Sequence, residues 1–130
     1  MAKTKKADPA SAISAILQPE LRGWTVHFIK CPFVKECGFC CSDLRRITIN
    51  LARIYGPEHL VRKILHEKAH ALGIKGEDEA EEYAREHAPE ATQRLANVGW
   101  EPAELLQTLE SVVPESSHVL KPEDGFMVTA

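Results

Sequence analysis

The sequence lacks the features that would assign it to a membrane or to nucleic acid. No run of apolar residues is long enough to cross a bilayer. The net charge is -3, so there is no basic excess to attract a nucleic acid or an acidic membrane surface. The first six residues include three lysines, but no apolar signal core follows them. We therefore expect a cytoplasmic protein with neither a nucleic-acid nor a membrane partner.

Cysteine is also scarce, with four residues at Cys31, Cys37, Cys40 and Cys41. Cys37 and Cys40 have the CxxC spacing of a zinc knuckle. A structural zinc site usually pairs two separated CxxC turns, however, and the adjacent Cys40 and Cys41 would bind one ion only with awkward geometry. We expect reduced thiols, as is usual inside cells. A structural zinc site, or a disulfide such as Cys31–Cys40, is the alternative.

The length of 130 residues, with 44% hydrophobic and 27% charged residues, predicts one domain with a small core. Residues 1–7 are expected to form a flexible arm. Residues 114–130 are expected to form an irregular tail, in which residues 126–128 either dock as a short strand or stay mobile.

The hydrophobic pattern predicts an α+β fold. A short helix begins at Asp8-Pro9 and ends near Pro19. Residues 24–29 and 45–51 alternate and are rich in β-forming residues, so we expect a small mixed or antiparallel sheet of two or three strands. His27 lies on the opposite face of its strand from the apolar residues, which favours a surface or edge position.

The C-terminal half is predicted to be helical. Glycine and proline signals separate four helices, over residues 57–72, 77–88, 89–96 and 101–109. The last of these has an apolar stripe, which we assign to the core rather than to a partner groove. The stripe consists of Leu105, Leu106 and Leu109.

The helix over residues 57–72 carries the motif HExxH at His66, Glu67 and His70. On a helix the two histidines lie one turn apart, so their imidazole nitrogens can reach one metal ion. Glu67 is about 100° round from His66, where it can take a proton from a water in the open position of the ion. HExxH is the zinc signature of metallopeptidases.

A catalytic zinc ion has three protein ligands and an open position, so a third ligand is needed. On the predicted helix over residues 77–88, the face made of small residues also carries Glu77 and Glu81. We predict Glu77 as the third ligand and Glu81, one turn later, as a hydrogen-bond partner of a ligating histidine. Glu79 and His87 are the alternatives, but they lie off this face.

The HExxH helix and the segment Glu77-x-Glu79-Ala80-Glu81-x-Tyr83-Ala84 together resemble compact gluzincin-type metallopeptidases, most closely the ImmA/IrrE type. The order of strand and HExxH helix is also similar to SprT-type metallopeptidases, but their later third histidine has no counterpart here. The resemblance covers roughly residues 24–89.

This resemblance implies a minimal zincin-like fold, in which a small sheet packs on the HExxH helix, with one catalytic Zn²⁺. It also implies a peptide or protein substrate, often a regulatory protein. The strand over residues 45–51 precedes the metal helix, and such a strand can bind an extended peptide along its edge.

Three features depart from the family pattern. Lys68 lies inside the motif on the apolar side of the helix, where it must snorkel, pair with a carboxylate or reach an open face. Glu81 stands where Asn or Asp is usual. No residue stands out as the oxyanion stabiliser, for which Tyr55, Tyr83 and Arg62 are candidates. An alternative function is therefore a zincin-fold binding or regulatory protein that no longer cuts.

Overall fold

The computed structural model describes residues 8–116 and 125–130. The expected arm over residues 1–7 and residues 117–124 of the expected tail lie outside this described part. Within it the elements are α1 (Pro9–Leu17), β1 (Thr25–Ile29), β2 (Gly38–Cys41), β3 (Arg46–Asn50), α2 (Pro57–Ala71), α3 (Glu77–Asn97), α4 (Pro102–Val112) and β4 (Phe126–Thr129). Short 3-10 turns at Ser42–Leu44 and Leu51–Arg53 follow β2 and β3.

The strands form one mixed sheet in the order β2-β3-β1-β4. β1 and β3 are parallel, and the other two pairings are antiparallel. The fold is therefore α+β as expected, but the sheet has four strands rather than two or three. β2 falls in the cysteine-bearing connection and β4 in the predicted tail. β4 is the docked strand that was one of the two alternatives for residues 126–128, whereas β2 was not predicted. Both are short, so alternation alone does not decide them.

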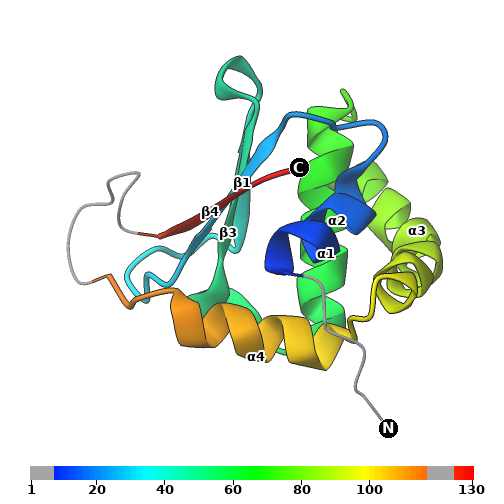
Figure 1. Ribbon diagram of the computed structural model, residues 1–130. Helices are drawn as coiled ribbons and strands as arrows, with labels where there is room; N and C mark the ends of the chain where they lie inside the picture. Colours follow the sequence, from blue (N-terminus) through cyan, green and yellow to red (C-terminus); the bar gives the residue numbers. More distant parts are fainter. Residues whose placement is uncertain (1–7, 117–124) are drawn as a thin grey trace, which may run out of the picture.

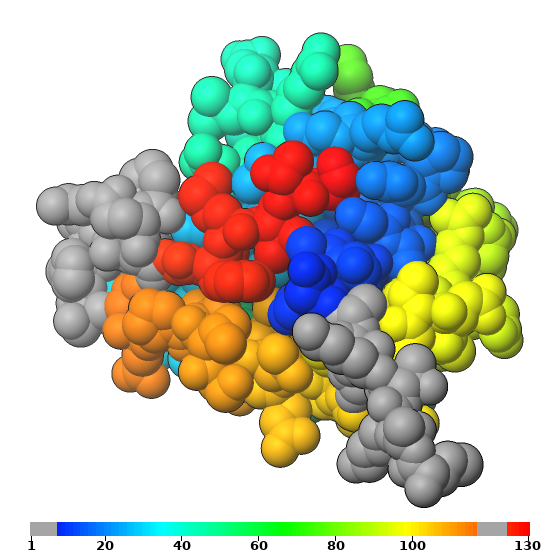
Figure 2. Space-filling view, viewed as in Figure 1, coloured from blue at the N-terminus to red at the C-terminus, as the bar shows by residue number. Residues whose placement is uncertain are grey.

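The helices gather on one side of the sheet (Figure 1). α2 packs against β2 and β3, while α3 packs mainly on α2 and α1. α1 contacts both β4 and α4, and these three elements share one face of the molecule (Figure 2). Buried apolar residues from all four helices and from β1, β3 and β4 join in a single hydrophobic cluster. Leu105 and Leu109 belong to this core, and Leu106 packs against it, as expected.

α3 differs from the prediction of two helices separated at Pro89. It runs unbroken from Glu77 to Asn97 with Pro89 inside it. A proline inside a helix removes one hydrogen bond and costs about 3 kcal/mol. Pro89 is exposed, so water can solvate the carbonyl that loses its donor. Ala84 and Ala91 are buried on either side of it, so packing of both halves keeps the helix continuous.

His27 also differs from the prediction, because it is only 5% exposed. β1 is an interior strand, flanked by β3 and β4. The chain just before β4 covers the ring, since a Cβ atom added at Gly125 would lie 2.6 Å from His27 Nε2. A surface position was expected because β4 was not predicted as a definite element.

Among the described residues, no helix combines the length and the hydropathy needed to cross a bilayer.

Candidate metal centre

The first half of the candidate centre is provided by α2. Pro57 occupies the first turn of this helix, and Leu72 caps its end. Gly73 follows with φ +102°, a conformation that side chains with a Cβ atom rarely adopt, and it turns the chain sharply. α3 therefore starts beside the last turn of α2, where Glu77 is its first residue.

The three predicted metal ligands converge. His66 Nε2 lies 2.9 Å from Glu77 Oε2, and His70 Nε2 lies 3.2 Å from Glu77 Oε1. One donor atom from each residue lies within 4.8 Å of the others, and no other group of this kind occurs among the described residues. Glu79, the alternative third ligand, folds back over Gly76 instead.

The second nitrogen of each imidazole ring is already engaged. His66 Nδ1 lies 2.9 Å from Glu81 Oε2, as expected for the partner of a ligating histidine. His70 Nδ1 lies 2.7 Å from the carbonyl oxygen of Ile74, a partner that the sequence does not reveal. These contacts orient both rings so that their Nε2 atoms face Glu77. Two imidazole nitrogens and one carboxylate oxygen form a donor set that fits Zn²⁺.

Glu77 itself is exposed over 78% of its side chain, whereas His66 is buried. The hydrogen bond with His66, helped by the nearby His70, lowers the pKa of Glu77 below its ordinary value. Glu77 is therefore ionised at neutral pH. The centre thus has a buried side, formed by α2, and an open side that solvent or a ligand can reach.

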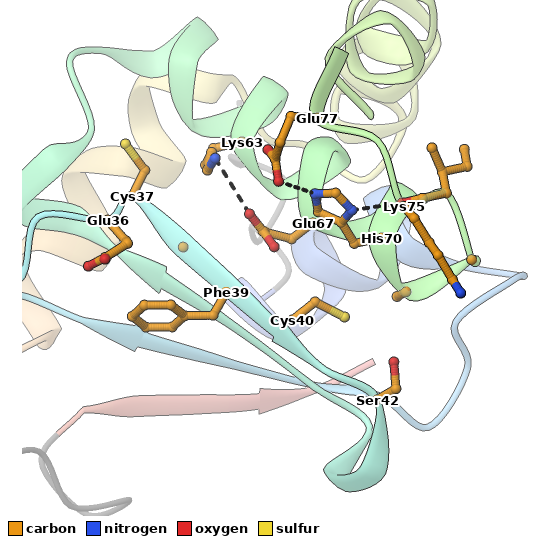
Figure 3. A pocket seen from close by; sticks show the side chains of 14 residues that line it. Glu36, Cys37, Phe39, Cys40, Ser42, Lys63, Glu67, His70, Lys75 and Glu77 are labelled. Carbon is orange, nitrogen blue, oxygen red and sulfur yellow. Dashed lines mark hydrogen bonds and ion pairs between the residues drawn. The ribbon is translucent and has the colours of Figure 1, made fainter. Parts of the chain in front are cut away.

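Glu67 lies beside this open side. It is 3% exposed, and its carboxylate is 3.5 Å from Lys63 Nζ, one turn earlier on α2 (Figure 3). β2 comes close at this point, because a Cβ atom added at Gly38 would lie 3.3 Å from the Glu67 Cγ atom and 2.7 Å from the Thr48 carbonyl oxygen. Glycine at position 38 therefore lets strand, helix and carboxylate come together.

A cleft of about 720 Å³ separates α2 and the α2–α3 turn from β2. Glu67, His70 and Glu77 open into it, and Lys63 and Cys40 also line its walls. In the described part of the chain β2 is an edge strand, whereas β3 is paired on both sides. The edge available to an extended peptide is therefore that of β2, and the expectation that the strand over residues 45–51 offers it is wrong.

The other candidate residues lie elsewhere. Tyr55 is 88% exposed and stacks on His59, Tyr83 stacks on His87, and Arg62 is exposed. None of the three oxyanion candidates lines the cleft. Lys63 does, and the sequence signal that could have revealed it is the spacing of four between Lys63 and Glu67 on one helix.

The four cysteines are free and do not converge on a metal-binding group. Cys31 is buried and Cys41 exposed, while Cys37 and Cys40 line the cleft. Burial raises the pKa of the Cys40 thiol, and the nearby Glu67 carboxylate acts in the same direction. Cys40 is therefore a protonated thiol at neutral pH rather than an activated nucleophile. Neither a four-cysteine zinc site nor a disulfide is present among them.

Lys68 pairs with a carboxylate, which is one of the three arrangements expected for it from the sequence. Only 4% of its side chain is exposed, and its Nζ atom donates to the Ile16 carbonyl oxygen at 3.0 Å and to Glu20 Oε1 at 3.1 Å. Both partners lie in α1 and the turn after it, away from the cleft. The lysine inside HExxH therefore leaves the metal-facing side of α2 clear.

No family model matches the chain, and no curated protein or solved structure matches it either. What the centre can do must therefore follow from its own side chains.

Proposed function

We propose that the chain is a zinc-dependent metallopeptidase with a minimal zincin-like fold, in which His66, His70 and Glu77 hold the ion. The observation that carries this proposal is the orientation of the two histidines. Each Nδ1 atom has a partner of its own, and each Nε2 atom faces the same carboxylate. Zinc is the ion of choice because two imidazoles, a carboxylate and an open position are the ligand set of many catalytic zinc sites.

Bound Zn²⁺ would supply a polarised substrate carbonyl and an acidified water. Glu67 is placed to accept the proton of the attacking water and to donate it to the leaving amine. Its burial and its contact with Lys63 restrict the carboxylate to one side of the cleft. The Lys63 ammonium also lies on the cleft wall, where it can stabilise negative charge that develops on the substrate.

The substrate we propose is an extended peptide or protein segment. In the described part of the chain β2 has an unpaired edge, and an extended peptide can add to such an edge through main-chain hydrogen bonds. The resemblance to ImmA/IrrE-type peptidases favours a regulatory protein as the source of this segment.

Metal content tests the centre directly. We expect one zinc per chain in protein purified without added metal, and its loss in His66→Ala and Glu77→Ala. The controls are Glu79→Ala and His87→Ala, which remove the same residue types from α3 outside the centre and should keep the ion. A parent protein that binds no zinc, even when zinc is offered, would contradict the proposal.

Hydrolysis is tested separately with Glu67→Gln. This variant should keep zinc and lose about 10²- to 10⁴-fold in cleavage rate, the usual contribution of a general acid–base group. Equal cleavage by the variant and the parent would show that Glu67 is not the base.

A second candidate function is a zincin-fold binding or regulatory protein that does not cut. It is favoured by one observation, that Tyr55, Tyr83 and Arg62 all lie outside the cleft. Zinc-loaded parent protein that cleaves no member of a peptide library, yet binds one of them specifically, would favour this function over hydrolysis.

A further inference from the structure

The cleft has opposite charges at its two ends. Glu36 lies at one end, just before β2, and Lys75 lies at the other, in the α2–α3 turn (Figure 3). Glu36 and Lys75 are both exposed, and neither forms an ion pair with another described residue. Glu67 and His70 lie between them in the same view. The reacting groups are thus flanked by one acidic and one basic end.

The remaining charged groups of the cleft are already matched. Lys63 pairs with Glu67, and Glu77 faces both histidines. They therefore contribute little to the choice between charged substrates, and any preference based on charge falls to Glu36 and Lys75.

β2 gives this charge pattern a direction. The strand runs from the Glu36 end of the cleft towards Ser42, near the Lys75 end. Antiparallel pairs are somewhat more stable than parallel ones and more common, and β2 already pairs antiparallel with β3. A peptide that adds antiparallel to β2 has its amino-terminal part at Lys75 and its carboxyl-terminal part at Glu36.

We infer that the cleft selects extended peptides with an acidic side chain before the scissile bond and a basic side chain after it. The inference rests on the proposed peptidase function, whose substrate class it specifies. The stretch from Glu36 to Ser42 along β2 spans six residue steps, and an extended partner advances at the same rate, so the two charged side chains should lie up to about six residues apart, with the scissile bond between them.

The size of the effect follows from the exposure of the two residues. An exposed ion pair changes an equilibrium by a factor of about 1.5 to 5, so an order that forms both pairs should be favoured over the reverse order, which forms neither, by roughly twofold to twenty-fivefold. Because both pairs are exposed to solvent, the preference should fall at high ionic strength.

The experiment compares two fluorescent peptides of identical composition, with a glutamate and a lysine in opposite orders around the same uncharged centre. Affinity is measured by fluorescence anisotropy on the zinc-loaded Lys63→Met/Glu67→Gln variant, which removes both charges of that pair, and cleavage is measured on the parent. We expect the peptide with glutamate first to bind roughly twofold to twenty-fivefold more tightly, and less so in 0.5 M salt, an ionic strength of about 3–4 times the physiological value.

The double variant Glu36→Lys/Lys75→Glu should invert the preference without a change in net charge. The matched control is Glu82→Lys/Arg85→Glu, which exchanges two exposed charges on α3 outside the cleft and should keep the original preference. Equal binding of the two peptides, a preference for lysine first, or a preference that survives the exchange at positions 36 and 75 would each overturn the inference.

The two proposals fail in different ways. Ordered binding without cleavage by the parent would remove the peptidase function and leave the inference standing. If the parent cleaved both peptides at equal rates and the two peptides bound equally well, the peptidase function would stand and the charge-order inference would be lost. Should the chain bind no zinc, the same anisotropy comparison on metal-free protein decides the inference with the same outcomes.

Discussion

The two sides of α2 treat buried polar groups in opposite ways. On one side Lys68 is enclosed by its own chain, with the Ile16 carbonyl and the Glu20 carboxylate as partners. On the other side His66 and His70 direct their Nε2 atoms at a carboxylate that is largely exposed. The Lys68 ammonium needs no external ligand, because two acceptors of the protein itself accept its hydrogen bonds.

The other side is different because two imidazole Nε2 atoms and a carboxylate converge there, and each of these groups can offer a lone pair to a cation. An external cation could replace the hydrogen bond between His66 and Glu77 and bind all three groups at once. The buried ammonium of Lys68 therefore stabilises the fold. The side chains of His66 and His70, in contrast, are arranged so that an external ion can bind. Variants on each side separate the two roles.

The largest contrast is expected in metal affinity. His66→Ala should weaken zinc binding at least about 100-fold, since even the loss of an outer partner of a ligand costs about 10- to 100-fold. Lys68→Met, on the opposite side of the same helix, should bind zinc like the parent. Zinc titration with a competing chelator measures both, and a large loss in Lys68→Met would show that the two sides are not independent.

The next effect concerns Glu81. Glu81→Gln keeps the size of the side chain but removes the charge that faces His66 Nδ1, so zinc affinity should fall by about 10- to 100-fold. Glu82→Gln is the control, because this neighbour is exposed and lies outside the centre. The same titration serves here. Unchanged affinity in Glu81→Gln would mean that Glu81 does not support the ligand.

Smaller effects are expected for stability on the Lys68 side. Glu20→Ala leaves a buried ammonium with one acceptor. Because Glu20 is 45% exposed, the cost should be about 1 kcal/mol rather than the 3–5 kcal/mol typical of a fully buried pair. Lys68→Met removes the buried ammonium itself, so no buried charge is left without its partner. It should therefore destabilise the protein less than Glu20→Ala. Urea denaturation measures both, and a larger loss in Lys68→Met would contradict this account of the pair.

The smallest effect is a dependence on pH. Burial raises the pKa of Glu20, but its own backbone N–H and the Lys68 ammonium outweigh this and hold it below its ordinary value. A lowered folded-state pKa means that the contribution to stability is complete above the unfolded-state pKa and is lost as pH falls through the folded-state value. The difference in unfolding free energy between the parent and Glu20→Gln should therefore vanish in acid. A difference that persisted there would need another cause.

The centre was more predictable than the sheet, for a physical reason. His66, His70, Glu77 and Glu81 lie on two consecutive helices, where a period of 3.6 residues fixes which side chains share a face. The cleft wall depends instead on β2, whose four residues form a strand only because β3 pairs with them. Lys63 and the Ile74 carbonyl were missed because their roles depend on which groups the fold brings next to them.

The same difference explains the errors in the rest of the fold. His27 has the pattern of an exposed residue, and only the pairing of the distant β4 with β1 buries it. Pro89 is a correct local signal for a helix boundary, but packing on both sides of it outweighs the local cost. Local signals thus located the two helices of the candidate metal centre and missed the tertiary contacts that surround them.

The position of Glu81 only fifteen residues after His66 has a consequence for how such a protein can diversify. Every side chain that would hold or orient the ion comes from one short helical hairpin, whereas the facing wall of the cleft comes from an earlier stretch of the chain. Under the proposed function, substitutions between Glu36 and Ser42 would therefore alter which peptide is accepted without a change in the residues proposed to hold the ion. Under the proposed function the hairpin would carry the reacting groups together with Lys75, and the rest of the recognition surface would come from the earlier segment, where it can change without the metal ligands.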